Sequence, residues 1–198
     1  MKPAPLPTAC ASALRLAEIA QMFWQAAECA FPQAIEAAAA AIGEAIEKGG
    51  KVLAFGNGGS AADAQHFCGE LMVRFQRERR ALPAIALVSD AAVLTACAND
   101  YEYEEVFARQ MEALGKPGDI ALAISTSGES ANVVRALEVA RRQGLQTILL
   151  TGAEAGAAAR FADLVVAAPA AATARIQELH LAAYHLICER LDARFASA

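Results

Sequence analysis

The sequence contains no long hydrophobic run, although hydrophobic residues make up 56% of its 198 positions. Charged residues or glycines interrupt every apolar stretch before it reaches the roughly 18 residues that a membrane-spanning helix requires. Near the N-terminus, Lys2 is followed by three prolines, and Arg15 and Glu18 interrupt the next segment, so the pattern of a secretory signal peptide is missing. We therefore expect a soluble, cytoplasmic protein that does not contact a membrane.

The sequence also lacks paired cysteines and an excess of positive charge. Its five cysteines are an odd number without a C-x-x-C pair, which argues against a disulfide framework or a zinc-thiolate site. We expect them to be reduced and mostly buried. The net charge of -5 argues against direct nucleic-acid binding, and Glu78 interrupts the basic cluster from Arg74 to Arg80, as in a solvated helix end.

Two turns rich in glycine and serine each follow a short apolar run. They are Gly56-Asn57-Gly58-Gly59-Ser60 and Ser125-Thr126-Ser127-Gly128. Glycine allows the backbone to approach a ligand closely, and successive N–H groups at the start of a helix suit a phosphate. Together the turns predict one phosphorylated small molecule held between two loops.

The apolar runs alternate with longer segments of helical periodicity, which predicts an α/β protein. The runs are residues 52–55, 84–88, 120–124, 147–150 and 164–167, and they are typical of parallel strands buried on both faces. Two helices, about 11–29 and 32–48, precede the first run, and a long helix with Thr173 as its N-cap ends the pattern at about Arg194. We expect one domain over residues 1–198, with residues 1–50 forming a subunit interface.

Five such strands most simply form a three-layer, doubly wound, flavodoxin-like sheet in the order 2-1-3-4-5. In this fold the ligand crevice lies between strands 1 and 3, at their C-terminal ends. Those two strands precede the two glycine- and serine-rich turns. The predicted topology and the predicted phosphate loops therefore indicate the same place.

The helix after the first turn carries a polar stripe. Ser60 and Asp63 resemble a capping box at its start, and His66, Glu70 and Arg74 follow at i, i+4 and i+8. This spacing predicts that an imidazole, a carboxylate and a guanidinium share one helix face. The alternative is an exposed face with a Glu–Arg ion pair.

The last helix carries a second polar pair, Gln177 and His185, which are eight residues apart in an otherwise apolar pattern, whereas His180 points elsewhere. A lone histidine in such a helix can instead be a core or interface residue. His66, Glu70, Gln177 and His185 would form a set of two nitrogens and two oxygens that suits zinc or a similar ion. The same groups also suit metal-free proton transfer.

Further polar residues are candidates for ligand contacts. Ser125, Thr126, Ser127 and Ser130 offer hydroxyl donors, although a plain turn with Ser130 as N-cap is the competing interpretation. Asn99-Asp100 could reach sugar hydroxyls, but these two residues are also an ordinary helix terminator.

With these residues in view, the chain resembles the sugar isomerase (SIS) domain family, and within it the phosphoheptose isomerases. The resemblance covers about residues 30–192. The segments that carry it are Gly56 to Phe67 with Glu70, Leu82 to Leu87, Ala98-Asn99-Asp100, Gly118-Asp119, Ile124 to Gly128, and Ala174 to Glu178.

The resemblance implies a homotetramer that converts sedoheptulose 7-phosphate to D-glycero-D-manno-heptose 7-phosphate through a cis-enediol, at the entry to ADP-heptose and lipopolysaccharide core synthesis. It implies a phosphosugar-binding core over residues 51–198 and one zinc ion per subunit on His66, Glu70, Gln177 and His185. Glu70 and His185 would be the catalytic proton-transfer pair. The implied substrate contacts are Asn57, Gly58, Gly59, Ser60, Glu70, Arg74, Asn99, Asp100, Ser125, Thr126, Ser127, Ser130 and Gln177.

Two alternatives stay open within this resemblance. A non-catalytic relative that binds the replication initiator DnaA has a similar sequence, but the residues equivalent to Glu70 and His185 are replaced there. An isomerase for another sugar phosphate is the second alternative, because phosphate loops do not specify chain length. Glu129, where many relatives have asparagine, and the stretch Ala170-Ala171-Ala172 are departures beside the expected site.

Overall fold

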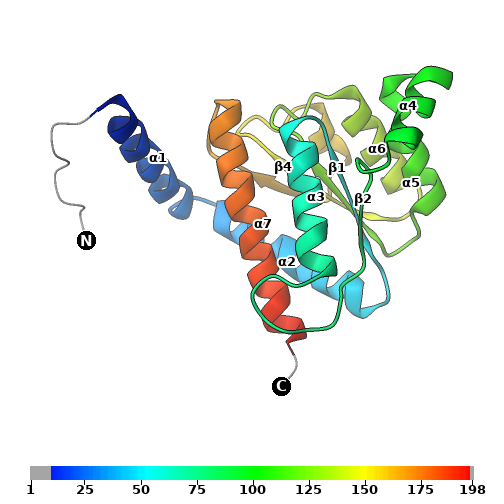
Figure 1. Ribbon diagram of the computed structural model, residues 1–198, viewed down its shortest axis with the longest axis horizontal. Coiled ribbons are helices and arrows are strands. Elements are labelled where there is room, and N and C mark those ends of the chain that lie inside the picture. Colours follow the sequence, from blue (N-terminus) through cyan, green and yellow to red (C-terminus); the bar gives the residue numbers. More distant parts are fainter. Residues whose placement is uncertain (1–9, 197–198) are drawn as a thin grey trace.

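The computed structural model describes residues 10–196 as a three-layer α/β structure around a five-stranded parallel sheet (Figure 1). The strand order β2-β1-β3-β4-β5 confirms the predicted topology. The strands are β1 (Val52–Gly56), β2 (Ala84–Ala86), β3 (Ile120–Ile124), β4 (Gln146–Thr151) and β5 (Leu164–Ala167). The predicted runs thus become strands, with boundaries that differ by at most two residues.

The α-helices are α1 (Ala11–Ala27), α2 (Phe31–Glu47), α3 (Gly59–Met72), α4 (Ala91–Asp100), α5 (Ala108–Leu114), α6 (Ala131–Arg142) and α7 (Thr173–Phe195). Two short 3-10 helices, η1 (Tyr103–Glu105) and η2 (Ala157–Phe161), lie in connections. Within residues 10–196, no helix is long and apolar enough to cross a membrane.

The core lies on both faces of the sheet because alternate strand residues point in opposite directions. On β1, Val52 and Ala54 pack in one buried cluster, which contains residues of α2, α3 and α7. Leu53 and Phe55 pack in the other, with residues of α5 and α6. This two-sided burial explains why the central strands are continuous apolar runs rather than alternating patterns.

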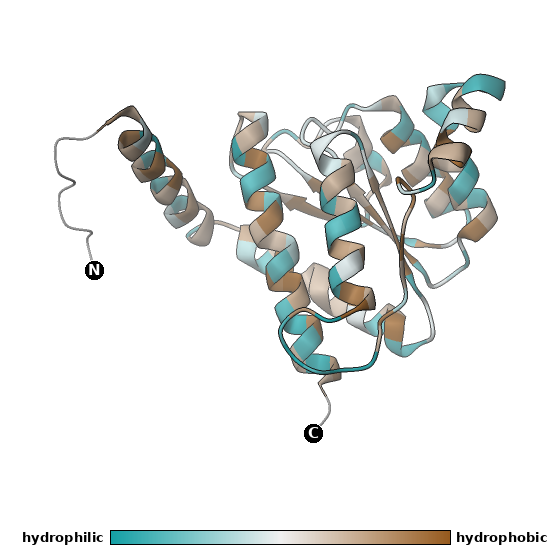
Figure 2. Cartoon of the chain, viewed as in Figure 1, coloured by the Kyte–Doolittle hydropathy of each residue, from teal (hydrophilic) through white to brown (hydrophobic). Residues whose placement is uncertain are grey.

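Helix α1 extends away from the sheet and its covering helices (Figure 1). Ala26 is its only buried residue, whereas Leu14, Leu16 and Trp24 are exposed. Figure 2 shows hydrophobic residues along this helix. Met22 and Ala26 pack against the core, but the exposed apolar side chains of α1 are left to meet another subunit, which is consistent with the predicted subunit interface.

Two local predictions need correction. The capping box is wrong: α3 begins at Gly59, so Ser60 lies inside the helix and the N-cap is Gly58, whose φ of +57° favours glycine. Thr173 is the first residue of α7 and not its N-cap, which is Ala172. The cysteines are free and mostly buried, as expected: Cys68, Cys97 and Cys188 are buried, and Cys10 and Cys29 are exposed.

Candidate active site

The two predicted phosphate loops lie side by side, because β1 and β3 are neighbours and Gly56 pairs in register with Ile124. The approach is close: a Cβ added to Gly56 would lie 2.5 Å from the carbonyl oxygen of Ile124. A side chain at this position would push the loops apart. Glycine is therefore required where the first loop leaves the sheet.

Asn57 in the first loop is fixed by two residues that the sequence analysis did not single out. Its amide exchanges hydrogen bonds with the amide of Asn132 on α6, at 2.8 and 2.9 Å, and Tyr103 donates to its Oδ1 at 3.1 Å. These contacts tie the first loop to the helix that follows the second loop. Asn132 and Tyr103 are 75 and 46 residues away from Asn57 in the sequence, so no local sequence pattern indicates these contacts.

The serines of the second loop order its backbone. The Gly128 N–H donates to Ser125 Oγ at 3.1 Å, and the Glu129 N–H donates to Ser127 Oγ at 3.2 Å. Ser130 is the N-cap residue of α6, but its side chain makes no capping hydrogen bond. A hydroxyl that accepts a hydrogen bond still has its own hydrogen to donate, so both serines keep a donor for a bound anion.

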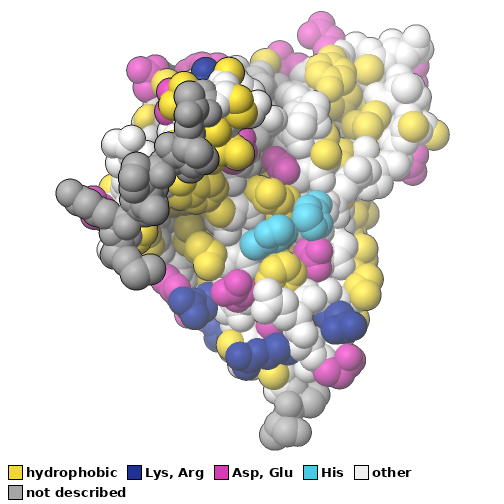
Figure 3. Space-filling view, turned by 60° about the vertical axis from the view of Figure 1, so that its left-hand side comes forward, with side chains coloured by type: hydrophobic (Ala, Val, Ile, Leu, Met, Phe, Trp, Pro, Cys, Tyr) yellow, Lys and Arg dark blue, Asp and Glu magenta, His cyan; other side chains and the backbone are white. Residues whose placement is uncertain are grey.

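The polar residues of α3 and α7 meet where these two helices pack together. The rings of His66 and His185 are 5.1 Å apart between centroids, and His66 Nε2 lies 3.0 Å from Glu70 Oε1. Figure 3 shows histidine side chains together on this face, with acidic side chains nearby. The structure thus brings together three of the four predicted metal ligands.

Gln177, the fourth predicted ligand, lies against the first loop. Its Nε2 would be 2.3 Å from a Cβ placed on Gly59, the first residue of α3. Gln177 therefore connects the start of α7 with the start of α3. The lack of a side chain at Gly59 makes room for it.

His66 has a further partner that the sequence analysis missed. The hydroxyl of Tyr184 lies 2.9 Å from His66 Nδ1 and donates to Asp63 Oδ1 at 3.4 Å. Tyr184 is buried, and burial raises its pKa; burial also raises the pKa of Asp63. The sequence feature that could have indicated these partners is their position: Asp63 precedes His66 by three residues, and Tyr184 directly precedes His185.

His185 has an unusual environment for a histidine. Its Nε2 is buried and has no hydrogen-bond partner. Burial lowers the pKa of His185, and the neighbouring His66 lowers it further, although Glu70 opposes both effects. A neutral imidazole with an unpartnered nitrogen is suited to accept a proton or to bind a metal ion.

The predicted donor set fits a zinc-type ion by its chemistry. It offers two imidazoles, a carboxylate and an amide, and the buried Nε2 of His185 needs a partner. In the structure, His66 Nε2 and Glu70 Oε1 contact each other. Within residues 10–196, no three His, Cys, Asp or Glu side chains are arranged to hold a metal ion. Binding would require His66 and Glu70 to exchange their mutual contact for the ion.

The predicted position of Arg74 on the α3 face is wrong, because α3 ends at Met72 and Arg74 lies in the loop of residues 73–83. Its Nε is 3.9 Å from Glu78 Oε2, and both side chains are exposed. The basic cluster is therefore a loop and not a solvated helix end. This loop still places a guanidinium shortly after Glu70.

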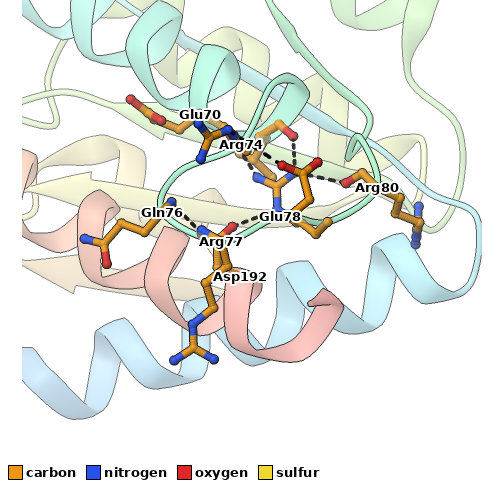
Figure 4. A network of polar contacts seen from close by, with 9 residues as sticks. Glu70, Arg74, Gln76, Arg77, Glu78, Arg80 and Asp192 are labelled. Atoms are coloured by element: carbon orange, nitrogen blue, oxygen red, sulfur yellow. Dashed lines mark hydrogen bonds and ion pairs between the residues drawn. The ribbon is translucent and has the colours of Figure 1, made fainter. Parts of the chain in front are cut away.

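The same loop is held against α7 by Asp192, which is labelled among the polar contacts in Figure 4. Asp192 accepts the backbone N–H groups of Gln76 and Arg77 at 2.7 and 2.8 Å, and Arg79 Nε at 2.8 Å. Burial alone would raise the pKa of Asp192, but these donors outweigh it and the pKa is lowered.

Arg79 in turn caps the end of α3. Its Nη1 donates to Leu71 O at 2.9 Å and its Nη2 donates to Glu70 O at 2.7 Å. The last carbonyls of a helix have no partner within the helix, so a buried guanidinium satisfies them. The backbone of Glu70 is thereby held by a contact that reaches α7 through Asp192.

Asn99 and Asp100 lie apart from the loops, at the end of α4. Asn99 Nδ2 donates to Asp100 Oδ1 at 2.9 Å, and among residues 10–196 no hydrogen bond joins either side chain to the two loops. Asp100 instead lines a groove of about 650 Å³ between β2, α4 and α5. The structure therefore does not bring these two predicted contacts to the site within one chain.

His180 points elsewhere, as predicted. It is fully buried, and its Nε2 lies 3.1 Å from the carbonyl oxygen of Thr151 at the end of β4. Burial lowers the pKa of His180 to about 4. It is a core residue that links α7 to the sheet.

Known proteins share this fold and sequence. Residues 17–152 match the family model described as the SIS domain. The chain is 53% identical to the phosphoheptose isomerase of Roseiflexus sp. (strain RS-1), over 80% of each chain, and 49% identical to that of Thiobacillus denitrificans, over 88% of this chain and 89% of the relative. The structure of phosphoheptose isomerase from Francisella tularensis is 40% identical with a TM-score of 0.87, covering 90% of this chain and 95% of that one.

Proposed function

The chain belongs to the SIS domain family and, within it, to the phosphoheptose isomerases, and from this premise we propose that it is an aldose–ketose isomerase acting on sedoheptulose 7-phosphate. Its product would be D-glycero-D-manno-heptose 7-phosphate, at the entry to ADP-heptose and lipopolysaccharide core synthesis. The relatives support this reading and give no support to the alternative of a DnaA-binding protein.

The observation that carries the proposal is the meeting of α3 and α7 beside the first phosphate loop. Glu70 and His185, the two proton-transfer candidates, both adjoin His66, and Gln177 joins the same two helices at Gly59. A sugar phosphate held by the loops would reach this cluster with its carbonyl end. Phosphate binding and proton transfer would then be served by neighbouring parts of one site.

The proposed reaction needs a base and an acid. Glu70 removes a proton from the carbon next to the carbonyl, and His185 delivers the hydrogen of its Nδ1 to the carbonyl oxygen, which gives the cis-enediol and leaves Nε2 for the ion. Reversal on the neighbouring carbon completes the isomerisation. Only Oε1 of Glu70 faces His66, so the second carboxylate oxygen can act as the base.

We propose one zinc ion per subunit on His66, Glu70, Gln177 and His185. When bound, such an ion would stabilise the negative charge that develops on the substrate oxygen. The support is the donor chemistry and the unpartnered nitrogen of His185. Coordination lowers the basicity of Glu70, so the separate use of its two oxygens is a part of this proposal.

The proposed substrate contacts follow the two loops. The backbone of Gly58, Gly59 and Ser60 and the side chains of Asn57 and the second-loop hydroxyls would bind the phosphosugar, with Glu70, Arg74 and Gln177 at the reacting end. Asn99 and Asp100 would contact substrate only if they belong to a site shared between subunits. A cytoplasmic homotetramer, in which α1 pairs with another subunit, accommodates this arrangement.

Product formation tests the proposal directly. Zinc-loaded protein is incubated with sedoheptulose 7-phosphate and, separately, with arabinose 5-phosphate, and the aldose and ketose products are separated by chromatography. We expect turnover of the heptulose phosphate to exceed turnover of the pentose phosphate. Faster turnover of the pentose phosphate would assign another sugar phosphate, and no turnover of either by a folded, metal-loaded protein would contradict the isomerase.

A further inference from the structure

Tyr184 and Asp63 lie next to the proposed zinc ligands but have no part in the reaction described above. We propose that they are positioning residues that hold the ring proton of His66 on Nδ1 and so leave its Nε2 available to a metal ion. This inference rests on the proposed zinc site and adds two residues outside the ligand set. We refer to Asp63, Tyr184 and His66 together as the 63–184–66 chain.

The direction of the hydrogen bonds follows from the number of hydrogens. The Tyr184 hydroxyl has one hydrogen and two neighbours, Asp63 Oδ1 at 3.4 Å and His66 Nδ1 at 2.9 Å. An ionised carboxylate can only accept, so the hydrogen of Tyr184 belongs with Asp63. His66 Nδ1 must then carry a hydrogen of its own and donate it to the Tyr184 oxygen.

The opposite arrangement is disfavoured by burial. If Tyr184 donated to His66, the carboxylate of Asp63 would face the hydroxyl oxygen without a hydrogen between them. Its other oxygen, Oδ2, is already buried without a partner. A half-buried carboxylate that has lost both donors carries a desolvation cost. The observed contacts therefore favour donation from His66 to Tyr184 to Asp63.

The consequence lies at the other nitrogen of the ring. A neutral imidazole with its hydrogen on Nδ1 has a lone pair on Nε2, the atom that faces Glu70 Oε1 at 3.0 Å. Because the Nε2 lone pair and the Glu70 carboxylate oxygen repel each other at this distance, they need a positive charge between them. The 63–184–66 chain therefore prepares His66 and Glu70 for a cation, as outer hydrogen-bond partners of metal-binding histidines generally do.

Nitrogen NMR of histidine-labelled protein tests this assignment without activity. The chain has three histidines, so the ring signals are assigned from His180→Gln and His185→Gln variants. In zinc-free protein we expect a proton on His66 Nδ1 in the parent chain. Tyr184→Phe and Asp63→Ala should each remove it, the first by deleting the acceptor and the second by turning the tyrosine hydrogen toward His66.

Zinc affinity, measured by competition with a chelator, gives a second readout. We expect Tyr184→Phe to weaken binding by about 10- to 100-fold, the usual effect of losing such an outer partner. Tyr101→Phe is the matched control because Tyr101 is exposed and distant from His66 in sequence, and it should change neither readout.

The outcomes separate this inference from the zinc proposal. An unprotonated His66 Nδ1 in the parent protein would overturn the role proposed for the 63–184–66 chain. An unchanged protonation pattern in both Tyr184→Phe and Asp63→Ala would overturn it as well. Failure of the parent chain to bind zinc would overturn the cofactor, while the NMR spectra would still decide the position of the proton. Thermal unfolding of each variant checks that the fold is intact before the spectra are compared.

Discussion

At the scale of single residues, the site depends on atoms that are close for different reasons. Glu70 and His66 are neighbours on one helix, whereas His185 and Tyr184 reach them from a helix more than 100 residues later. Spacing of i, i+4 predicts the first kind of contact. The second kind depends on how α3 and α7 pack, which a single sequence does not specify.

Gly59→Ala tests the close approach of Gln177. An alanine Cβ would lie 2.3 Å from Gln177 Nε2, the flexible end of that side chain, so we expect Gln177 to move and the fold to survive. Zinc affinity and affinity for the sugar phosphate should both fall, while the midpoint of thermal unfolding stays near that of the parent.

Gly69→Ala is the matched control for this substitution. Gly69 lies on the same helix, and a Cβ there meets nothing within 4 Å. Alanine should be tolerated with a stability gain of up to about 1 kcal/mol, because glycine is the poorer helix former. Equal losses of zinc affinity in both variants would show that Gln177 is not the affected group.

At the scale of elements, α7 serves both the site and the core. It carries Gln177 and His185 toward α3, His180 toward β4, and Asp192 toward the loop that follows α3. One helix thereby fixes several parts of the site relative to one another. Substitutions along α7 should consequently separate into those that affect chemistry and those that affect stability.

Asp192→Asn should destabilise the protein strongly. The side chains of Asp192 and Arg79 are each 1% exposed, so the substitution leaves a buried guanidinium without its counter-charge. The expected loss in the free energy of unfolding is about 3–5 kcal/mol, measured by chemical denaturation. The control is Glu36→Gln, which breaks the exposed ion pair with Arg190 and should cost less than about 1 kcal/mol. Comparable losses of unfolding free energy in the two variants would refute the importance of the buried ion pair between Asp192 and Arg79.

His180 should make stability depend on pH. Its pKa is about 4 in the folded chain and about 6.5 when unfolded, so between these values the unfolded chain binds more protons. The contribution of neutral His180 is thus fully present above pH 6.5 and is lost as the pH falls toward 4, by about 3 kcal/mol at pH 4. Denaturation curves at several pH values measure this.

The variant His180→Gln isolates the effect. It keeps a polar side chain on α7 but has no group that titrates in this range. The difference in unfolding free energy between parent and variant should change between pH 6.5 and pH 4. A difference that is independent of pH would mean that His180 is not buried in the neutral form.

Sequence predicted the sheet better than the details of its loops. Parallel strands buried on both faces are continuous apolar runs, so their number and order followed from pattern and from the usual winding of such sheets. The end of α3 did not follow, because it is set by Arg79 and Asp192, which are 113 residues apart. For the same reason Arg74 was predicted on a helix face although it lies in a loop.

Two parts of the proposed site show the same limit. Asn99 and Asp100 were expected beside the loops because of a family resemblance, and a single chain leaves them at the end of α4. Tyr184 was not predicted, because a tyrosine in an apolar helix pattern has the appearance of a core residue. Its role depends on an oxygen atom that only the packing of two helices places against His66.

At the scale of the whole molecule, α1 is the feature that a single chain does not explain. It projects from the body in Figure 1, and Leu16 and Trp24 are 65% and 62% exposed. Contiguous exposed apolar side chains of this kind mark interaction sites. Pairing with another subunit would bury them.

Trp24 reports on this pairing because it is the only tryptophan in the sequence. If α1 packs between subunits, the fluorescence maximum of Trp24 should shift to shorter wavelength as protein concentration is raised, in step with the mass measured by sedimentation. A spectrum typical of exposed tryptophan at concentrations where sedimentation shows that assembly is complete would place the interface elsewhere.

The most direct test of the isomerase mechanism is proton NMR of sedoheptulose 7-phosphate with zinc-loaded protein in D2O. The account predicts new aldose signals and deuterium replacing the proton next to the carbonyl, both lost when Glu70→Gln removes the base while sugar-phosphate binding is retained. The matched variant Glu154→Gln, at an exposed carboxylate, should behave like the parent. Full turnover by Glu70→Gln, or neither aldose nor exchange with the folded, metal-loaded parent, would contradict the account.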